Sequence, residues 1–288
     1  MRRSALIDRL RGASRWDVLI IGGGATGLGC AVDAAARGHT TLLLEAHDFA
    51  KGTSSRSTKL IHGGVRYLAQ GRIGLVREAL AERSTLLANA PHLVHPQRFV
   101  VPVYRQWDRL LLGLGLAAYD WLAGRHSLGA SRLLSPTETV AALPTVRRRG
   151  LVGGIAYMDA RFDDARLAVT LMRTVFDHGG LALNYLPVKA LRHEQGITSG
   201  AVAQDAESGE SFAIEAGVVI NAAGVWADDI RRLDAATAPS QLTPSQGAHL
   251  VVERDFLPGD AALLIPKTSD GRVLFIIPWQ GKVLLGTT

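Results

Sequence analysis

Apolar positions along the chain form short unbroken runs, typical of buried strands, and longer stretches with helical spacing. Residues 18–21 are an unbroken apolar run that predicts a strand buried on both faces. Glycines and small residues follow, and they predict a tight turn and then a helix that ends at Gly38. Residues 40–45 predict the next strand. This strand–turn–helix–strand order is typical of an α/β nucleotide-binding domain.

Helical spacing recurs in three later segments. It predicts a helix within 77–96 that ends before Pro96, and a helix over 163–178 that Asp163 or Asp164 caps. Residues 109–126 predict a third helix, for which a core position and a position at a membrane surface both stay open. The remaining predicted elements are a strand over 182–191, a strand–turn–helix over 215–230 and an antiparallel sheet over 245–288.

The first turn carries the spacing of a dinucleotide-binding motif. Gly22, Gly24 and Gly27 form G-x-G-x-x-G, in which glycines permit a tight turn, close approach to a pyrophosphate and close helix–sheet packing. Glu45 follows at the end of the second predicted strand, where an acid can bind an adenosine ribose. We therefore predict dinucleotide binding rather than a chance glycine turn, and FAD or NAD rather than NADP.

A hydroxyl-rich stretch over 53–68 favours FAD over NAD. Thr53, Ser54 and Ser55 can hydrogen-bond phosphate or ribitol oxygens, and Gly63 and Gly64 allow the backbone to pass close to a flat ring. The alternative is a surface loop before the next helix. Around 221–224, a second strand–turn–helix with small residues predicts another contact with FAD, through Ala223 and Gly224.

The stretch TSSRSTKLIHGGVRYL resembles FAD-dependent glycerol-3-phosphate dehydrogenases, within the D-amino-acid-oxidase-like flavoproteins. The similarity continues through EALAERSTLLANAPHL, YMDARFDDARLAV, NAAGVWADDI, SQGAHLVV and VLFIIPWQGKVLLGTT, and so covers nearly the whole chain. The resemblance implies a two-domain flavoprotein that oxidises sn-glycerol 3-phosphate to dihydroxyacetone phosphate and passes electrons to a membrane quinone.

The resemblance also assigns site residues. It places these residues around FAD: Gly22, Gly24, Ala25, Thr26, Gly27, Glu45, Thr53, Ser54, Ser55, Val188, Ala223 and Gly224. It places Lys59, His62 and Gly63 near the flavin, Arg66 and Tyr67 near the substrate, and His249 in the substrate pocket. Alcohol oxidation needs a base, and we predict His249 for proton abstraction and His62 for flavin positioning. No metal site is expected.

These features together predict the fold class: an α/β protein with a discontinuous Rossmann-type FAD-binding domain and an inserted, mainly antiparallel β substrate domain. We predict the FAD-binding domain at 16–68 and 151–232, and the substrate domain at 69–150 and 233–288. In the family, the principal phosphate-binding arginines lie beyond the position that matches Thr288, and lysine is common where this chain has Gln246. We therefore expect an N-terminal part with an incomplete substrate domain.

Composition adds little that is specific. Lys+Arg 32 against Asp+Glu 26 leaves a net charge of +6, which fits a basic surface, an anionic membrane surface or an anionic substrate. Nucleic acid is disfavoured because no basic run is interleaved with aromatic residues. A single cysteine, Cys30, is typical of a reducing compartment. The expected location is cytoplasmic and peripheral on the inner face of the cell membrane, with a homodimer as a further expectation.

Two other functions stay open. One is a related FAD-dependent amine or amino-acid oxidase, which the segment KLIHGGVRYL disfavours. The other is a flavin-binding chain without turnover, which the expected incompleteness of the substrate domain favours.

Overall fold

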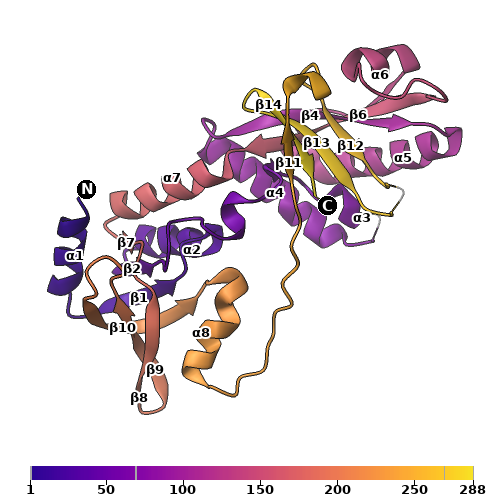
Figure 1. Cartoon of the computed structure of the whole chain (residues 1–288). Helices are drawn as coiled ribbons and strands as arrows, with labels where there is room; N and C mark the ends of the chain where they lie inside the picture. Colours follow the sequence, from indigo (N-terminus) through magenta and orange to yellow (C-terminus); the bar gives the residue numbers. More distant parts are fainter. Residues whose placement is uncertain (1, 69, 269, 288) are drawn as a thin grey trace. The chain divides into compact units, whose positions relative to one another are not determined.

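In the computed structural model, which describes residues 2–68, 70–268 and 270–287, the chain divides into two compact units. Met1–Ser57 and Asp164–Ser245 form the first unit, and Thr58–Asp163 and Gln246–Thr288 form the second. Each unit is built on its own β-sheet (Figure 1).

The first unit contains a six-stranded sheet in the part of the chain that the structure describes. In sheet order its strands are β7 (Leu181–Leu183), β2 (Thr41–Leu44), β1 (Trp16–Ile21), β10 (Ser211–Asn221), β9 (Ile197–Gln204) and β8 (Val188–Glu194). The strands from β7 to β10 are parallel, whereas β10, β9 and β8 pair antiparallel. This arrangement confirms the predicted nucleotide-binding fold.

Alternation along the parallel strands divides the core of the first unit into two layers. Ile20 and Leu43 face one layer, whereas their neighbours Leu19 and Leu42 face the other, as the period of two in a strand requires. The helices of this unit are α1 (Arg3–Gly12), α2 (Ala25–Ala36), α7 (Asp164–Asp177) and α8 (Ala227–Asp234). Helices α2 and α7 contribute to the first layer, and helix α1 contributes to the second.

The second unit contains an eight-stranded sheet, again counted over the described residues. In sheet order its strands are β11 (Leu250–Val252), β14 (Lys282–Gly286), β13 (Leu274–Trp279), β12 (Ala262–Ile265), β4 (Val94–Val103), β6 (Gly153–Phe162) and β3 (Leu60–Ile61), with β5 (Arg132–Leu134) also on β6. All of these pairs are antiparallel except β12 with β4. The mainly antiparallel sheet is as predicted.

Helices cover the sheet of the second unit. They are α3 (Val65–Leu68), α4 (Ile73–Asn89), α5 (Gln106–Ala123) and α6 (Pro136–Ala142). Val76 and Leu80 of α4 and Leu116 of α5 share a buried cluster with Phe99 of β4. The opposite face of β4 contributes Val100 to a second cluster. The two faces of one strand therefore join separate apolar layers.

The compact units differ from the predicted domain boundaries. The prediction grouped 58–68 and 151–163 with the nucleotide-binding domain, whereas both segments lie in the second unit. It placed 233–245 in the substrate domain, whereas this segment lies in the first unit. The reason for the first difference is strand pairing, because β3 pairs with β6 and β6 pairs along its whole length with β4.

The predicted helix within 77–96 is too long. Helix α4 ends at Asn89, and Pro96 lies within strand β4. A proline is tolerated there because β12 pairs with β4 only at Phe99 and Val100, so Pro96 has a β6 partner but no β12 partner. The predicted single strand over 182–191 is also wrong. A bend at Asn184 and Tyr185, where Tyr185 has a φ of 55°, separates β7 from β8.

Helix α5 has both a buried and an exposed apolar face. Leu116, Tyr119 and Ala123 are buried, whereas Trp107 and Trp121 are 72% and 73% exposed. The buried face fits the alternative of a core helix, and contact of the exposed face with a membrane surface stays a prediction. Among the described residues, no helix is long and apolar enough to cross a membrane.

Candidate functional site

The glycine turn between β1 and α2 brings three backbone segments close together. Gly22 has a φ of +115°, and a Cβ atom there would lie 2.7 Å from the carbonyl carbon of Ala222 at the end of β10. A Cβ atom on Gly27 would overlap the carbonyl oxygen of Gly22. Only glycine fits these two positions, since a side chain would separate α2 from the strands.

A cavity of about 400 Å³ opens beside this turn, within the range of about 300–1,000 Å³ that is usual for ligand pockets. All of its lining residues belong to the first unit. The predicted cofactor residues that line it are Gly22, Gly24, Ala25, Thr26, Glu45, Thr53, Ser54, Val188, Ala223 and Gly224. Segments far apart in the sequence therefore meet at one cavity.

The amino end of α2 lines this cavity through Gly24, Ala25 and Thr26. The first backbone N–H groups of a helix lack partners within the helix, and its dipole favours negative charge there. Ser54 Oγ accepts a hydrogen bond of 2.8 Å from the Ala25 N–H, which ties the hydroxyl-rich segment to the start of the helix. Lys51, which the sequence patterns did not single out, also lines the cavity and adds a positive charge.

Glu45 closes strand β2 at the cavity wall. Its Oε2 accepts a hydrogen bond of 2.6 Å from the Gly23 N–H, and its Oε1 accepts one of 2.8 Å from the His47 N–H. These bonds hold the carboxylate in one orientation beside the glycine turn. Each carboxylate oxygen has two lone pairs, so acceptor capacity remains for a ribose hydroxyl.

Several residues of the cavity wall were not predicted from the sequence. Leu186 and Pro187 line it just before Val188. Trp226 lines it after the second small-residue turn, with its ring centre 6.3 Å from that of His47. A Cβ atom on Gly52 would lie 3.1 Å from the Trp226 ring. A tryptophan after a glycine turn was the available signal, because large aromatic side chains often line ligand pockets.

The other predicted cofactor residues lie elsewhere. Gly27 packs against the carbonyl oxygen of Gly22 and does not line the cavity. Ser55 does not line it either, and follows Thr53 and Ser54 in the same short 3₁₀ turn. Lys59, His62 and Gly63 belong to the second unit. Asp164 anchors the hydroxyl-rich segment from the start of α7, because its Oδ2 accepts hydrogen bonds of 3.1 and 2.7 Å from the Ser57 N–H and hydroxyl.

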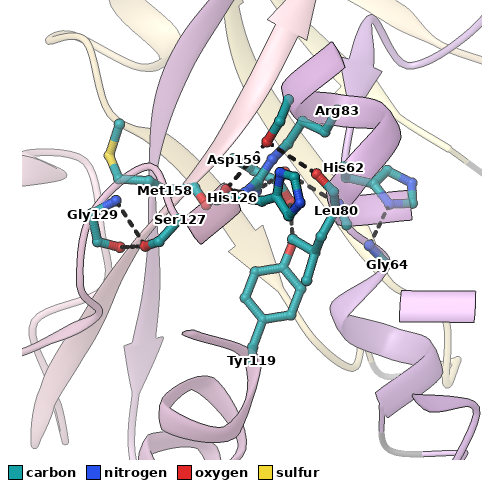
Figure 2. Close-up of polar contacts among 12 residues, drawn as sticks. His62, Gly64, Leu80, Arg83, Tyr119, His126, Ser127, Gly129, Met158 and Asp159 are labelled. Atoms are coloured by element: carbon teal, nitrogen blue, oxygen red, sulfur yellow. Dashed lines mark hydrogen bonds and ion pairs between the residues drawn. The ribbon is translucent and has the colours of Figure 1, made fainter. Parts of the chain in front are cut away.

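In the second unit, the turn after β3 carries a histidine in a defined orientation. His62 is exposed, and its Nδ1 accepts a hydrogen bond of 3.1 Å from the Gly64 N–H (Figure 2). Its ring stacks on Phe275 at 6.3 Å between centres. The buried Lys59 has its Nζ 5.5 Å from the Trp279 ring centre. Two aromatic rings of β13 therefore lie beside the side chains of His62 and Lys59.

The predicted substrate residues Arg66 and Tyr67 both lie in α3. The side chain of Arg66 is outside the described part of the structure. Tyr67 is half-buried, and a Cβ atom on Gly64 would lie 2.7 Å from its ring. Tyr67 therefore packs directly on the turn that bears His62.

His249, the predicted base, has a partner that was not predicted from the sequence. Its Nε2 lies 3.0 Å from the Thr58 hydroxyl oxygen, a hydrogen-bond distance. A Cβ atom on Gly286 would overlap the imidazole ring of His249, so glycine leaves room for the ring there. Thr58 and Gly286 thus orient His249 from two strand-end segments of the same unit.

Comparison with known proteins identifies the family. A family model described as "FAD dependent oxidoreductase" (DAO) matches residues 17–288. The chain belongs to this family.

Relatives of the DAO chain carry a more specific name. A protein of Schizosaccharomyces pombe named "Glycerol-3-phosphate dehydrogenase, mitochondrial" is 42% identical over 303 residues, which cover 99% of this chain and 47% of that protein. The human protein of the same name is 41% identical, over 99% of this chain and 41% of its own length. The chain therefore spans about half the length of the curated relatives it matches.

Solved structures agree with the family. A glycerol-3-phosphate dehydrogenase from Bacillus halodurans, determined in complex with FAD, matches with a TM-score of 0.80 and 35% identity. The match covers 99% of this chain and 49% of that chain. A glycine oxidase from Geobacillus kaustophilus has a TM-score of 0.73 at 20% identity, and so shares the fold.

The residues of the first unit fit the cofactor of the DAO family. Glycines stand at the two positions where a side chain would displace backbone, and a helix amino end faces the cavity beside Lys51. Glu45 provides a carboxylate at the end of β2. Anion-binding N–H groups and an acid for ribose are the donor set that a dinucleotide such as FAD requires.

Proposed function

We propose that this DAO chain holds FAD in the cavity of its first unit. The N–H groups at the start of α2 would bind the pyrophosphate, and Glu45 would bind the adenosine ribose. Val188, Ala223 and Gly224 would contact the cofactor through backbone from the opposite wall. Ser54, which accepts a hydrogen bond from Ala25, holds the hydroxyl-rich segment at the start of α2. The convergence of these segments on one cavity supports this proposal.

The proposed reaction is the oxidation of sn-glycerol 3-phosphate to dihydroxyacetone phosphate, with electrons passed to a quinone. The observation that carries it is the identity of about 42% over 99% of this chain to proteins named glycerol-3-phosphate dehydrogenase. Bound FAD would supply the hydride acceptor for the alcohol carbon. The named relatives are about twice as long as this chain, and their activity is carried over to it as a proposal.

Within this proposal, the residues of the second unit act on the substrate. His249 takes the hydroxyl proton, since a histidine exchanges protons near neutral pH. Thr58 holds the His249 ring by the contact at Nε2. His62 and Gly63 approach the flavin, Lys59 adds a positive charge, and the pair Arg66 and Tyr67 contacts the substrate.

A membrane surface is the partner proposed for α5. Trp107, Leu110, Leu111, Leu114 and Trp121 recur at helical spacing and are all more than half exposed. Apolar residues with tryptophans at both ends of the helix are typical of a helix that lies in a bilayer interface. Arg77 adjoins this face at Trp121, and Arg105 and Arg125 flank the two ends of the helix. Their charge complements anionic lipid.

The reaction is tested by adding sn-glycerol 3-phosphate to the FAD-loaded chain without oxygen and following the visible absorption of the flavin. Bleaching by this substrate, but not by glycerol or glycine, is the expected result. Bleaching by an amine alone would favour a DAO-family amine oxidase instead. Bound but unreduced FAD with every substrate would favour a flavin-binding chain without turnover.

Two glycine variants test the cofactor site itself. Gly27→Ala introduces a Cβ atom that overlaps the carbonyl oxygen of Gly22, whereas Gly29→Ala introduces one with no atom within 4 Å. Both positions lie in α2, so helix propensity changes equally. We expect Gly27→Ala to lose bound FAD on desalting and Gly29→Ala to retain it. Equal FAD content in both variants would contradict the proposed site.

A further inference from the structure

A buried ion pair lies directly beneath the turn that carries His62. Arg83 of α4 donates to Asp159 of β6 over 2.9 Å, between Nη1 and Oδ1 (Figure 2). The two side chains are only 1% and 3% exposed. The structure therefore removes both charges almost completely from water.

Further hydrogen bonds connect this pair to its surroundings. Asp159 Oδ1 accepts a bond of 3.2 Å from the Gly63 N–H, and Oδ2 accepts one of 3.2 Å from the Tyr119 hydroxyl. Arg83 also donates from Nη2 to the carbonyl oxygen of His126 over 2.9 Å. Helices α4 and α5, strand β6 and the turn after β3 thus meet at one carboxylate.

Stability alone is a weak reason for such a pair. Burial raises the pKa of Asp159, and the Arg83 guanidinium opposes that shift. Burial likewise raises the pKa of Tyr119. Because desolvation offsets much of the attraction, well-packed apolar residues often replace a buried ion pair without loss of stability. What apolar residues cannot replace is the directional bond to the Gly63 N–H.

The turn at Gly63 packs closely against Tyr119, which belongs to this hydrogen-bond network, and against Leu80. A Cβ atom on Gly63 would overlap both the Tyr119 hydroxyl and the Leu80 side chain, so the backbone of Gly63 lies in contact with them. His62 precedes Gly63, and its ring orientation depends on the hydrogen bond from the Gly64 N–H. The direction of the His62 ring is therefore set by the backbone that Asp159 holds.

We propose that Arg83, Asp159 and Tyr119 are positioning residues, which hold the Gly63 amide and thereby direct His62 toward the flavin. This inference rests on the proposed function, in which His62 and Gly63 approach the cofactor. None of the three side chains needs to touch the substrate. Their effect passes through one backbone N–H group.

The test compares three variants of the full chain. The double variant Arg83→Met/Asp159→Leu replaces the pair by apolar groups and leaves no unpaired charge. Tyr119→Phe removes one hydroxyl and is the milder change, in case the double variant does not fold. The control Arg3→Met/Asp205→Leu removes a partly buried ion pair of 2.6 Å from the first unit.

The first measurement is hydrogen exchange of the Gly63 amide, followed by mass spectrometry without substrate. In the double variant, exchange is expected to be roughly tenfold faster or more, because the amide loses a charged acceptor. Tyr119→Phe is expected to accelerate exchange by a smaller factor, and the control is expected to leave it unchanged. Unchanged exchange in a cooperatively folded double variant would overturn the proposal.

The second measurement is the visible circular dichroism of bound FAD, which reports the surroundings of the flavin without any turnover. The double variant is expected to bind FAD fully but to show an altered spectrum. Faster Gly63 exchange with an unaltered spectrum would show that the network holds the turn without positioning it at the flavin, and would overturn the inference. If glycerol 3-phosphate fails to reduce the wild-type flavin, the proposed reaction fails while both of these measurements remain decisive.

Discussion

Replacement of the two exposed tryptophans of α5 tests the proposed membrane contact most directly. Trp107 and Trp121 are 72% and 73% exposed, and the Arg77 guanidinium lies 5.9 Å from the Trp121 ring centre. The variants are Trp107→Ser, Trp121→Ser and the double substitution. Ile197→Ser in β9 is the matched control, because Ile197 is 72% exposed but lies in the first unit.

The expected magnitude follows from the exposed area. A tryptophan buries about 150–250 Å² when it is fully covered, so the exposed part of each ring amounts to about 110–180 Å². At about 25 cal/mol per Å², half-insertion of that area contributes about 1.5–2 kcal/mol. Each substitution should then weaken binding about ten- to thirtyfold. The two rings are about 21 Å apart along the helix, so their effects should nearly add.

The assay is co-sedimentation of the FAD-loaded chain with vesicles of anionic or neutral lipid at low and high salt. The wild type should bind anionic vesicles more tightly than neutral vesicles. High salt should remove only the share of the binding free energy that the arginines contribute. The tryptophan variants should lose binding to both vesicle types, whereas Ile197→Ser should bind as the wild type does. Equal binding by wild type and the double variant would refute the reasoning. Sedimentation velocity without lipid tests the alternative that a second copy of the chain covers this face, because the wild type would then sediment as a dimer.

Two further predictions concern single side chains. Thr58→Val keeps the shape of the side chain but removes the partner of His249 Nε2, so flavin reduction by glycerol 3-phosphate should slow about five- to tenfold at unchanged FAD content. An unchanged rate would remove Thr58 from the site. Burial raises the pKa of Asp205, but hydrogen bonds from the Glu207 N–H and the Arg3 guanidinium outweigh that effect. The pKa of Asp205 therefore lies below the usual range for a carboxyl group. The resulting stability is present above the ordinary carboxyl pKa and is lost as the pH falls through the depressed value. Asp205→Asn should therefore cost about 1–2 kcal/mol at pH 7 and progressively less below pH 4, in urea unfolding across that range.

Local patterns were sufficient for the glycine turn and the elements that flank it. The strand, glycine turn and helix around Gly22 are consecutive in the sequence, and each step has its own local signal. Glu45 could be placed because the second parallel strand follows directly. The wall made by Leu186, Pro187 and Trp226 was missed because it comes from chain segments whose approach depends on the sheet order.

Non-local pairing explains why the helix predicted up to Pro96 ends earlier. The apolar pattern before Pro96 is compatible with a helix, but β6 pairs with β4 across ten consecutive positions and fixes an extended strand. The same pairing draws 151–163 into the second unit. No local propensity reports such pairing, because the partner strand lies about 60 residues away in the sequence.

The Arg83–Asp159 pair was not predicted, although the sequence contains a signal for it. In each of two elements, a charged residue occupies a position at which the apolar pattern calls for a hydrophobic one. Val76, Leu80 and Arg83 are the buried positions of α4, so the arginine occupies the apolar stripe at helical spacing. Ile155, Tyr157 and Asp159 are buried at every second position of β6, so the aspartate occupies the inward stripe of a strand. A lone charge in either stripe would be costly to bury, and opposite charges in two stripes that face one core can compensate each other. Complementary breaks of the apolar pattern therefore predict that α4 contacts β6 through these two side chains, and the same contact supplies the carboxylate that holds the Gly63 amide.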